Sequence, residues 1–253
     1  MNLCSKDIHM KRFLFFIMLA LLPTMIMAQV ARGEIKRPKN VKQRTAATKT
    51  PAVKKGKEEA KSRIICPDSN HPHMIDLALP SGTLWACCNV GASRPDDFGH
   101  YFAWGETKKK SDYSPGTYQY GNDKDHLMNI GSDIAGTKYD AATANWGDPW
   151  RTPTNTQCNE LIDNTTSQWT TYNGVSGRAF SSKKNGHTVF FPAAGYVLAN
   201  ELFNIGSNGY IWTSSIFRDN QNEARCIGFF SGYVYPFSDL RFCGHSIRPV
   251  RKK

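Results

Sequence analysis

The chain has 253 residues, with 32 lysines and arginines against 21 aspartates and glutamates, a formal net charge of +11. Residues 29–63 hold twelve basic and three acidic residues and no aromatic ring, whereas residues 64–253 hold seventeen of each sign. This distribution argues against a specific nucleic-acid-binding domain, whose folded part would itself be basic. A segment with the composition of 29–63 cannot bury enough apolar surface to offset its ordering entropy, so we expect a disordered basic linker there.

The N-terminus has the pattern of a secretory signal peptide. Lys11 and Arg12 precede an apolar run that ends at Ala28, so residues 1–28 are predicted to be removed on export to the periplasm, the cell surface or the medium. A spanning helix needs about 20 apolar residues, and Pro23 interrupts this run. The mature protein is therefore expected not to be transmembrane. On an exported protein, the linker would bind anionic envelope polymers or serve as a solvated spacer.

Residues 64–253 are predicted to form one α+β domain of short antiparallel strands, one or two short helices and long loops. Its first elements are strands at Met74–Leu79 and Thr83–Val90, joined by a turn with Pro80 and Gly82 at the favoured positions. A short aromatic strand is expected at Tyr101–Glu106. A polar loop follows as far as residue 137.

Two helices are expected next. Asp140 is a suitable N-cap for a short helix, Ala141–Asn145. Thr154 and Gln157 form a capping-box pair, which predicts a second helix that ends at Asn164.

Turn signals then indicate hairpins. Asn185-Gly186 is a strong two-residue turn pair and predicts a hairpin of Phe180–Ser182 with His187–Pro192. Further strands are expected, in order, at Tyr210–Ser215, Ala224–Phe230, Tyr233–Phe237 and His245–Val250.

The Ser231-Gly232 turn sets the register of the last hairpin. Facing residues share one side of a sheet, and the side alternates along each strand. One side therefore carries Ile227, Phe229 and Val234 and is the better candidate for the core. The other side carries Cys226, Gly228, Phe230, Tyr233, Tyr235 and Phe237. Two interpretations of that aromatic side stay open: a second buried layer, or a surface that contacts a ligand.

Several motifs occur in an order that resembles the major paralogous domain of bacterial surface proteins, first named from Fibrobacter. They are DLALPSGTLWACCNVGA, YFAWGE, DAATANWGDPWRTPT, ELID, WTTYNGVSGRAF, VFFPAAGY, GYIWTSS and SIRPV, and they cover nearly all of residues 74–250. The resemblance implies a C-type-lectin-like fold, similar in architecture to the formylglycine-generating enzyme. It also implies that the first and last strands close a lower sheet, and that the hairpin at 224–237 belongs to an upper one.

The sequence departs from these families in ways that bear on chemistry. Cys87-Cys88 and Thr165 replace residues that are often Thr-Cys and Cys in the resembling domains. The catalytic cysteine pair of the formylglycine-generating enzyme has no counterpart in context, and the calcium-lectin triplets are absent. Neither catalysis nor calcium-dependent sugar binding follows from the fold alone. Export makes disulfides possible among the six cysteines of the mature chain: Cys66, Cys87, Cys88, Cys158, Cys226 and Cys243.

The leading hypothesis is an exported, non-catalytic recognition domain for a glycan or a surface protein. Its candidate ligand-binding residues are rings that suit stacking, and two arginines in flanking loops that suit carboxylate or phosphate: Phe230, Tyr233, Tyr235, Phe237, Arg218 and Arg241. No catalytic residue, metal site or cofactor is predicted. The alternatives are a structural envelope-associated protein tethered by its basic tail, and an enzyme on a formylglycine-generating-enzyme-like scaffold.

Overall fold

The computed structural model describes residues 73–121 and 127–253, so the predicted signal peptide and linker lie outside the described residues. The helices are η1 (a 3₁₀ turn, Pro115–Thr117), α2 (Ala141–Trp146) and α3 (Asn155–Asn164). The strands are β1 (Met74–Asp76), β2 (Thr83–Ala86), β3 (Thr165–Tyr172), β4 (Val175–Ser182), β5 (Thr188–Pro192), β6 (Tyr196–Leu198), β7 (Glu201–Phe203), β8 (Asn208–Ile216), β9 (Glu223–Phe230), β10 (Val234–Leu240) and β11 (Val250–Lys252).

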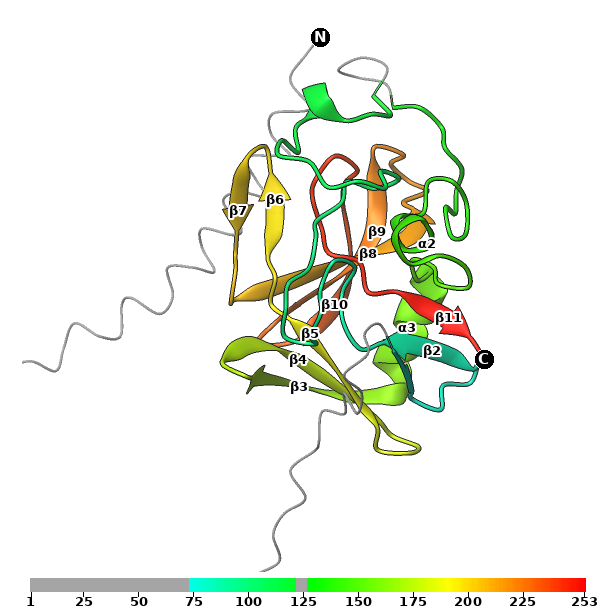
Figure 1. The fold of residues 1–253 in the computed structure, drawn as a ribbon, viewed down its shortest axis with the longest axis vertical. Coiled ribbons are helices and arrows are strands. Elements are labelled where there is room, and N and C mark those ends of the chain that lie inside the picture. The colour runs from blue at the N-terminus through cyan, green and yellow to red at the C-terminus, as the bar shows by residue number, and fades with distance from the viewer. Residues whose placement is uncertain (1–72, 122–126) are drawn as a thin grey trace, which may run out of the picture. The chain divides into compact units, whose positions relative to one another are not determined.

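The strands form four small antiparallel sheets, in the orders β1-β2-β11, β10-β9-β8, β3-β4-β5 and β6-β7 (Figure 1). With so few helical residues, the architecture fits an α+β or mostly-β class. In the part of the chain that the structure describes, no helix has the length and apolar character needed to cross a membrane.

The first and last strands share one sheet, with β2 between them. Ile75 of β1 and Val250 of β11 both pair with Trp85. These strands are shorter than the sequence predicts. β1 ends at Asp76 because its carboxylate accepts the N–H of Ala78 at 2.8 Å, and Ala78 has a φ of +50°. That local turn competes with strand pairing.

Two predicted strands are largely wrong. Tyr101–Glu106 makes a single bridge, between Phe102 and His245. His245–Val250 joins the terminal sheet only at its end, where the carbonyl of Pro249 accepts the N–H of Ala86 of β2 at 2.9 Å and Val250 begins β11. Its earlier part runs past two other segments instead, with Ser246 accepting the N–H of Trp212 at 3.0 Å. Pro249 has no N–H to donate, which limits ladder pairing just before β11.

Both helices form where the sequence predicts them. Asp140 caps α2, which extends one residue further than expected, to Trp146. Thr154 and Gln157 make the capping box of α3, which ends at Asn164.

The predicted pairing of Phe180–Ser182 with His187–Pro192 is confirmed, but the two-residue turn is wrong. The N–H of Ser182 donates to the carbonyl of His187 at 2.8 Å, so four residues, 183–186, form the loop. The first strand of this hairpin belongs to a longer ladder. β4 begins at Val175 and pairs along its whole length with β3, a strand the sequence analysis missed. Tyr172 faces Val175 across Asn173 and Gly174, which have φ values of +49° and +83°. This is the geometry of a type I′ turn, which favours Asn-Gly.

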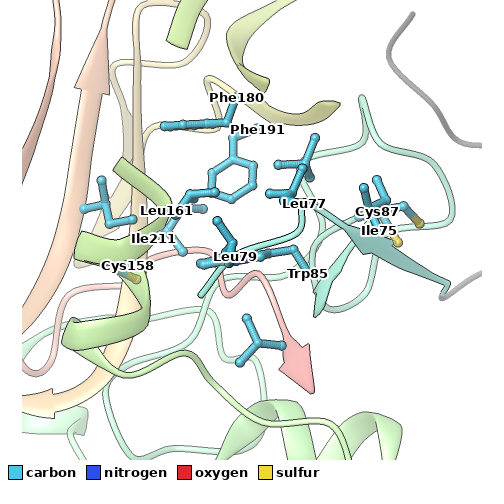
Figure 2. Close-up of a cluster of buried hydrophobic side chains, with 14 of the residues drawn as sticks. Ile75, Leu77, Leu79, Trp85, Cys87, Cys158, Leu161, Phe180, Phe191 and Ile211 are labelled. Atoms are coloured by element: carbon cyan, nitrogen blue, oxygen red, sulfur yellow. The ribbon is translucent and has the colours of Figure 1, made fainter. Parts of the chain in front are cut away.

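The principal core cluster gathers side chains from eight elements and the segments between them. Trp85, Phe180 and Phe191 are fully buried and lie near Leu77 and Leu161 (Figure 2). The aliphatic side of the β9–β10 hairpin points into this cluster, as predicted. Ile227 and Phe229 are buried there, and Val234 packs against them in part. The opposite, aromatic side of the hairpin must therefore face away from this core.

Candidate recognition surface on the β9–β10 hairpin

The register predicted from the Ser231-Gly232 turn is confirmed. The N–H of Phe230 donates to the carbonyl of Tyr233 at 3.1 Å, and Tyr235 faces Gly228. Further along, Phe237 faces Cys226. The four candidate rings consequently lie in a row on one side of β9 and β10. We call Phe230, Tyr233, Tyr235 and Phe237 the ring row.

Each ring in the row contacts the next. The centroids of Phe230 and Tyr233 are 4.4 Å apart, those of Tyr233 and Tyr235 are 5.4 Å apart, and those of Tyr235 and Phe237 are 5.8 Å apart. Phe237 continues the row to Tyr210 of β8 at 6.1 Å. Most of these contacts are tilted or edge-to-face, which are favoured geometries for aromatic pairs. The rings therefore hold one another in place.

Exposure is highest beside the turn. Tyr233 is 56% exposed, and the other three rings of the row are half-buried. Tyr210, which continues the row on β8, is 3% exposed. Of the two interpretations left open by the sequence, neither a sealed layer nor a fully open platform is correct. The row is a surface at the turn end and part of the interior at the other.

Because Gly228 has no side chain, the ring of Tyr235 can pack closely against the sheet. A Cβ at this position would lie 2.7 Å from Cζ of the Tyr235 ring, so any side chain would push the ring away. Burial, and to a lesser extent the nearby Cys226, raises the pKa of Tyr235 to about 12. The phenol is thus neutral at physiological pH and can donate a hydrogen bond.

A buried polar group lies under the interior end of the row. The imidazole of His245 stacks on Trp212, with centroids 4.1 Å apart, and its Nε2 lies 3.1 Å from Oδ2 of Asp239. The Cys243 thiol donates to the other oxygen of that carboxylate at 3.9 Å.

Cysteine, histidine and aspartate are residue types of nucleophilic catalysis, but the thiols here are poorly placed for it. Burial raises the pKa of Cys226 and of Cys243 well above the ordinary value, whereas a nucleophilic cysteine needs a lowered one. Cys158, Cys226 and Cys243 are buried and carry no disulfide, and Cys66 lies outside the described residues. The arrangement does not favour the enzyme alternative.

The two candidate arginines lie far along the hairpin from the Ser231-Gly232 turn. Arg218 is exposed in the loop between β8 and β9. The expectation that Arg241 belongs to a surface loop is wrong. β10 continues to Leu240, and Arg241 is 2% exposed, with its guanidinium 4.9 Å from the centre of the Trp104 ring. The structure therefore does not bring the arginines together with the exposed end of the ring row.

Two rings that were not predicted from the sequence extend the surface sideways. Tyr196 of β6 stacks on Phe203 of β7 at 5.3 Å and contacts Tyr210 at 5.5 Å. Both stacked rings are half-buried. The sequence signal for this hairpin was a pair of short apolar runs on either side of Ala199. In the structure Ala199 lies in the turn, with a φ of +53°.

Comparisons of the chain with protein-family models, with curated proteins and with solved structures find no match. The candidate surface therefore has to be interpreted from its own geometry.

Proposed function

We propose that this protein is an exported, non-catalytic recognition domain that binds a glycan through the ring row. The observation that carries the proposal is a row of four touching rings, of which Tyr233 is 56% exposed and the other three are half-buried. Flat rings that their neighbours already hold lose little conformational freedom when a ligand stacks on them. The two tyrosine hydroxyls add polar groups beside the apolar faces.

The size of the surface favours a glycan over a protein partner. A stable protein complex buries roughly 800 Å² on each partner. Within the ring row only Tyr233 is strongly exposed, and its neighbours are half-buried. A patch of this size suits one or two sugar rings. A protein target remains an outcome of the test below.

We also propose that the domain has a C-type-lectin-like fold. A sheet that holds both the first and last strands, separate from the β10-β9-β8 sheet, supports the C-type-lectin-like arrangement that the sequence resemblance implies. The signal-peptide pattern and the basic linker support export and a place in the cell envelope.

The test is a glycan and surface-protein binding screen with the full mature chain, followed by titration of the hit. Tyr233→Ala removes the exposed ring, and Tyr235→Phe removes only a hydroxyl. Tyr172→Ala, at a half-buried tyrosine of the separate β3-β4-β5 sheet, is the matched control.

We expect Tyr233→Ala to weaken glycan binding about tenfold or more, because stacking residues act as hot spots. The control variant should bind like the wild type. Unchanged affinity in well-folded Tyr233→Ala and Tyr235→Phe would remove the ring row as the site. Binding of a protein but of no glycan would contradict the choice of ligand.

The structural alternative predicts a different result. If the basic linker retains the protein in the envelope, deletion of residues 30–63 should release it during fractionation while leaving glycan binding intact. Retention without the linker would contradict that alternative.

A further inference from the structure

The sheet β3-β4-β5 has one open edge, and β3 forms it. β3 lies on the outer side of this sheet (Figure 1) and pairs with β4 through all eight of its residues. The strand at the other edge, β5, is buried along its whole length. On β3, by contrast, the side chains of Thr166, Gln168 and Thr171 are exposed. The edge along β3 is therefore open to solvent.

The backbone of β3 directs hydrogen-bonding groups away from the sheet. Tyr172 and Val175 flank the two-residue turn of the β3–β4 hairpin, so they form a hydrogen-bonded pair. Such pairs alternate along an antiparallel ladder, which leaves the N–H and C=O groups of Ser167, Trp169 and Thr171 on the outer side. Within residues 73–121 and 127–253, these backbone groups have no hydrogen-bond partner. They are a template for a further strand.

β3 lacks the features with which proteins usually protect an open edge. Charged side chains, proline and bulges serve this purpose. The sequence of β3, TTSQWTTY, has no charge and no proline, and its register with β4 is unbroken. The outer strand of the β10-β9-β8 sheet carries both Pro236 and Asp239. The contrast between the two edges indicates that β3 is kept free for a partner strand.

We infer that β3 pairs antiparallel with β3 of a second copy of this chain, so that two sheets become one. Pairing centred on Gln168 places Ser167 of one copy opposite Trp169 of the other, and both direct backbone groups to the shared edge. Thr166 then faces Thr170, and cross-strand threonine pairs stabilise a sheet. Because β3 is uncharged, no like charges face each other along the pair.

The residues that flank β3 also favour a second copy as the partner. Two lysines and one aspartate flank its start, and two aspartates and one arginine flank its end: Lys183, Lys184 and Asp163, and Asp96, Asp97 and Arg94. Antiparallel self-pairing sets the start of one strand beside the end of the other. The excess of positive charge thus lies nearest the excess of negative charge, which favours this orientation.

The pairing would give the protein two ring rows on one body. Arg178 of β4 donates to the hydroxyl of Ser167 at 3.0 Å and to the carbonyl of Phe230 at 2.6 Å, so this sheet is tied to the turn end of the ring row. A target with repeated sites would bind both rows with increased avidity. The inference itself does not depend on the proposed function.

The experiment measures association of the full mature chain by sedimentation velocity over a concentration series, together with amide hydrogen exchange. Gln168→Lys and Gln168→Glu each set like charges against each other at the centre of the pair. Thr171→Pro removes an outward N–H and no bond to β4. Gln119→Lys makes the same charge change at an exposed position outside the sheet and is the matched control.

We expect a weak dimer, because one strand pair buries less than the roughly 800 Å² per partner of a standard interface. Each Gln168 variant should weaken it about fivefold, and an equimolar mixture of the two should restore it. Thr171→Pro should weaken it about tenfold, since a hydrogen bond is lost from each copy. The control should associate like the wild type. The amides of Ser167, Trp169 and Thr171 should exchange more slowly as concentration rises.

The inference is overturned if the mature chain stays monomeric at about 1 mM, the weak end of the usual affinity range. It is also overturned if folded Thr171→Pro dimerises like the wild type, or if the mixed Gln168 variants associate no better than either alone. An extended peptide that binds β3 of a monomeric chain would contradict the choice of a second copy.

Discussion

Replacement of Asp140 tests how the structure anchors α2 and the loops around it. This carboxylate is fully buried, and its partners are N–H and hydroxyl groups. Oδ1 accepts from the N–H of Ala142 at 2.9 Å and from the hydroxyl of Thr152 at 2.6 Å. Oδ2 accepts from the N–H of Gly136 at 2.8 Å and from the hydroxyl of Thr143 at 3.0 Å. One side chain thus ties together a loop, a helix start and the segment that leads to α3.

The expected loss of unfolding free energy follows from the number of buried donors that are left without an acceptor. In Asp140→Asn, one oxygen becomes an NH₂ group, and in either orientation it meets a backbone N–H, that of Gly136 or that of Ala142. A buried donor left unsatisfied costs about 1–3 kcal/mol. Asp140→Ala loses every acceptor and the helix cap, and should destabilise by about 3–5 kcal/mol after water enters. Both are large against the roughly 5–15 kcal/mol stability of a typical domain.

The assay is urea unfolding monitored by tryptophan fluorescence, with the m-value checked for constancy. The matched control is Thr154, which caps α3 from a partly buried position. Thr154→Asn should be neutral within about 0.5 kcal/mol, because Asn is as good an N-cap as Thr where only one N–H must be satisfied. If Asp140→Asn is equally neutral, the carboxylate is not the common acceptor that the geometry indicates.

Two further predictions concern the β8–β9 pair and the buried thiols. In Gly209→Ala, the new Cβ would overlap with Cζ of the Phe229 ring, so we expect about 1–3 kcal/mol of destabilisation in the same assay. In Gly116→Ala the Cβ meets nothing within 4 Å, so this variant should be neutral. Because burial raises the thiol pKa of Cys226 and Cys243, their contribution to stability is complete below the unfolded thiol pKa of about 8.5 and declines as pH rises above it. The melting temperature should fall above that pH, less so in Cys243→Ala. Iodoacetamide at pH 8 should modify these thiols only after unfolding, and rapid native modification would contradict the burial.

The parts of the fold that short-range chemistry encodes were predictable. The Ser231-Gly232 turn determined the pairing of the β9–β10 hairpin, including Tyr235 opposite Gly228. Asp140 and Thr154 marked the helix starts correctly. The strand β3 was missed because its sequence, TTSQWTTY, has little apolar alternation. Its Asn173-Gly174 turn was the signal that could have found it.

What long-range packing decides was not predictable. Arg241 looks like a loop residue because it follows Ser238 and Asp239, yet it is buried by partners 113 and 123 positions earlier, Met128 and Tyr118. Tyr118 in turn donates to the carbonyl of Trp104 at 2.7 Å. The polar composition of residues 107–137 gives no sign of this packing, so the burial of Arg241 could not be inferred before the structure was known.

The sheet that joins β1, β2 and β11 has a mechanical consequence. Both outer strands are antiparallel to β2, so they run in the same direction on its two sides. A tension applied between the two ends of the domain would draw β1 and β11 oppositely along their own axes. The hydrogen bonds of both strand pairs would then be loaded together in shear, instead of opening one at a time. In a domain that flow or a moving partner pulls from both ends, this geometry would keep the terminal sheet paired at the place where the force is applied.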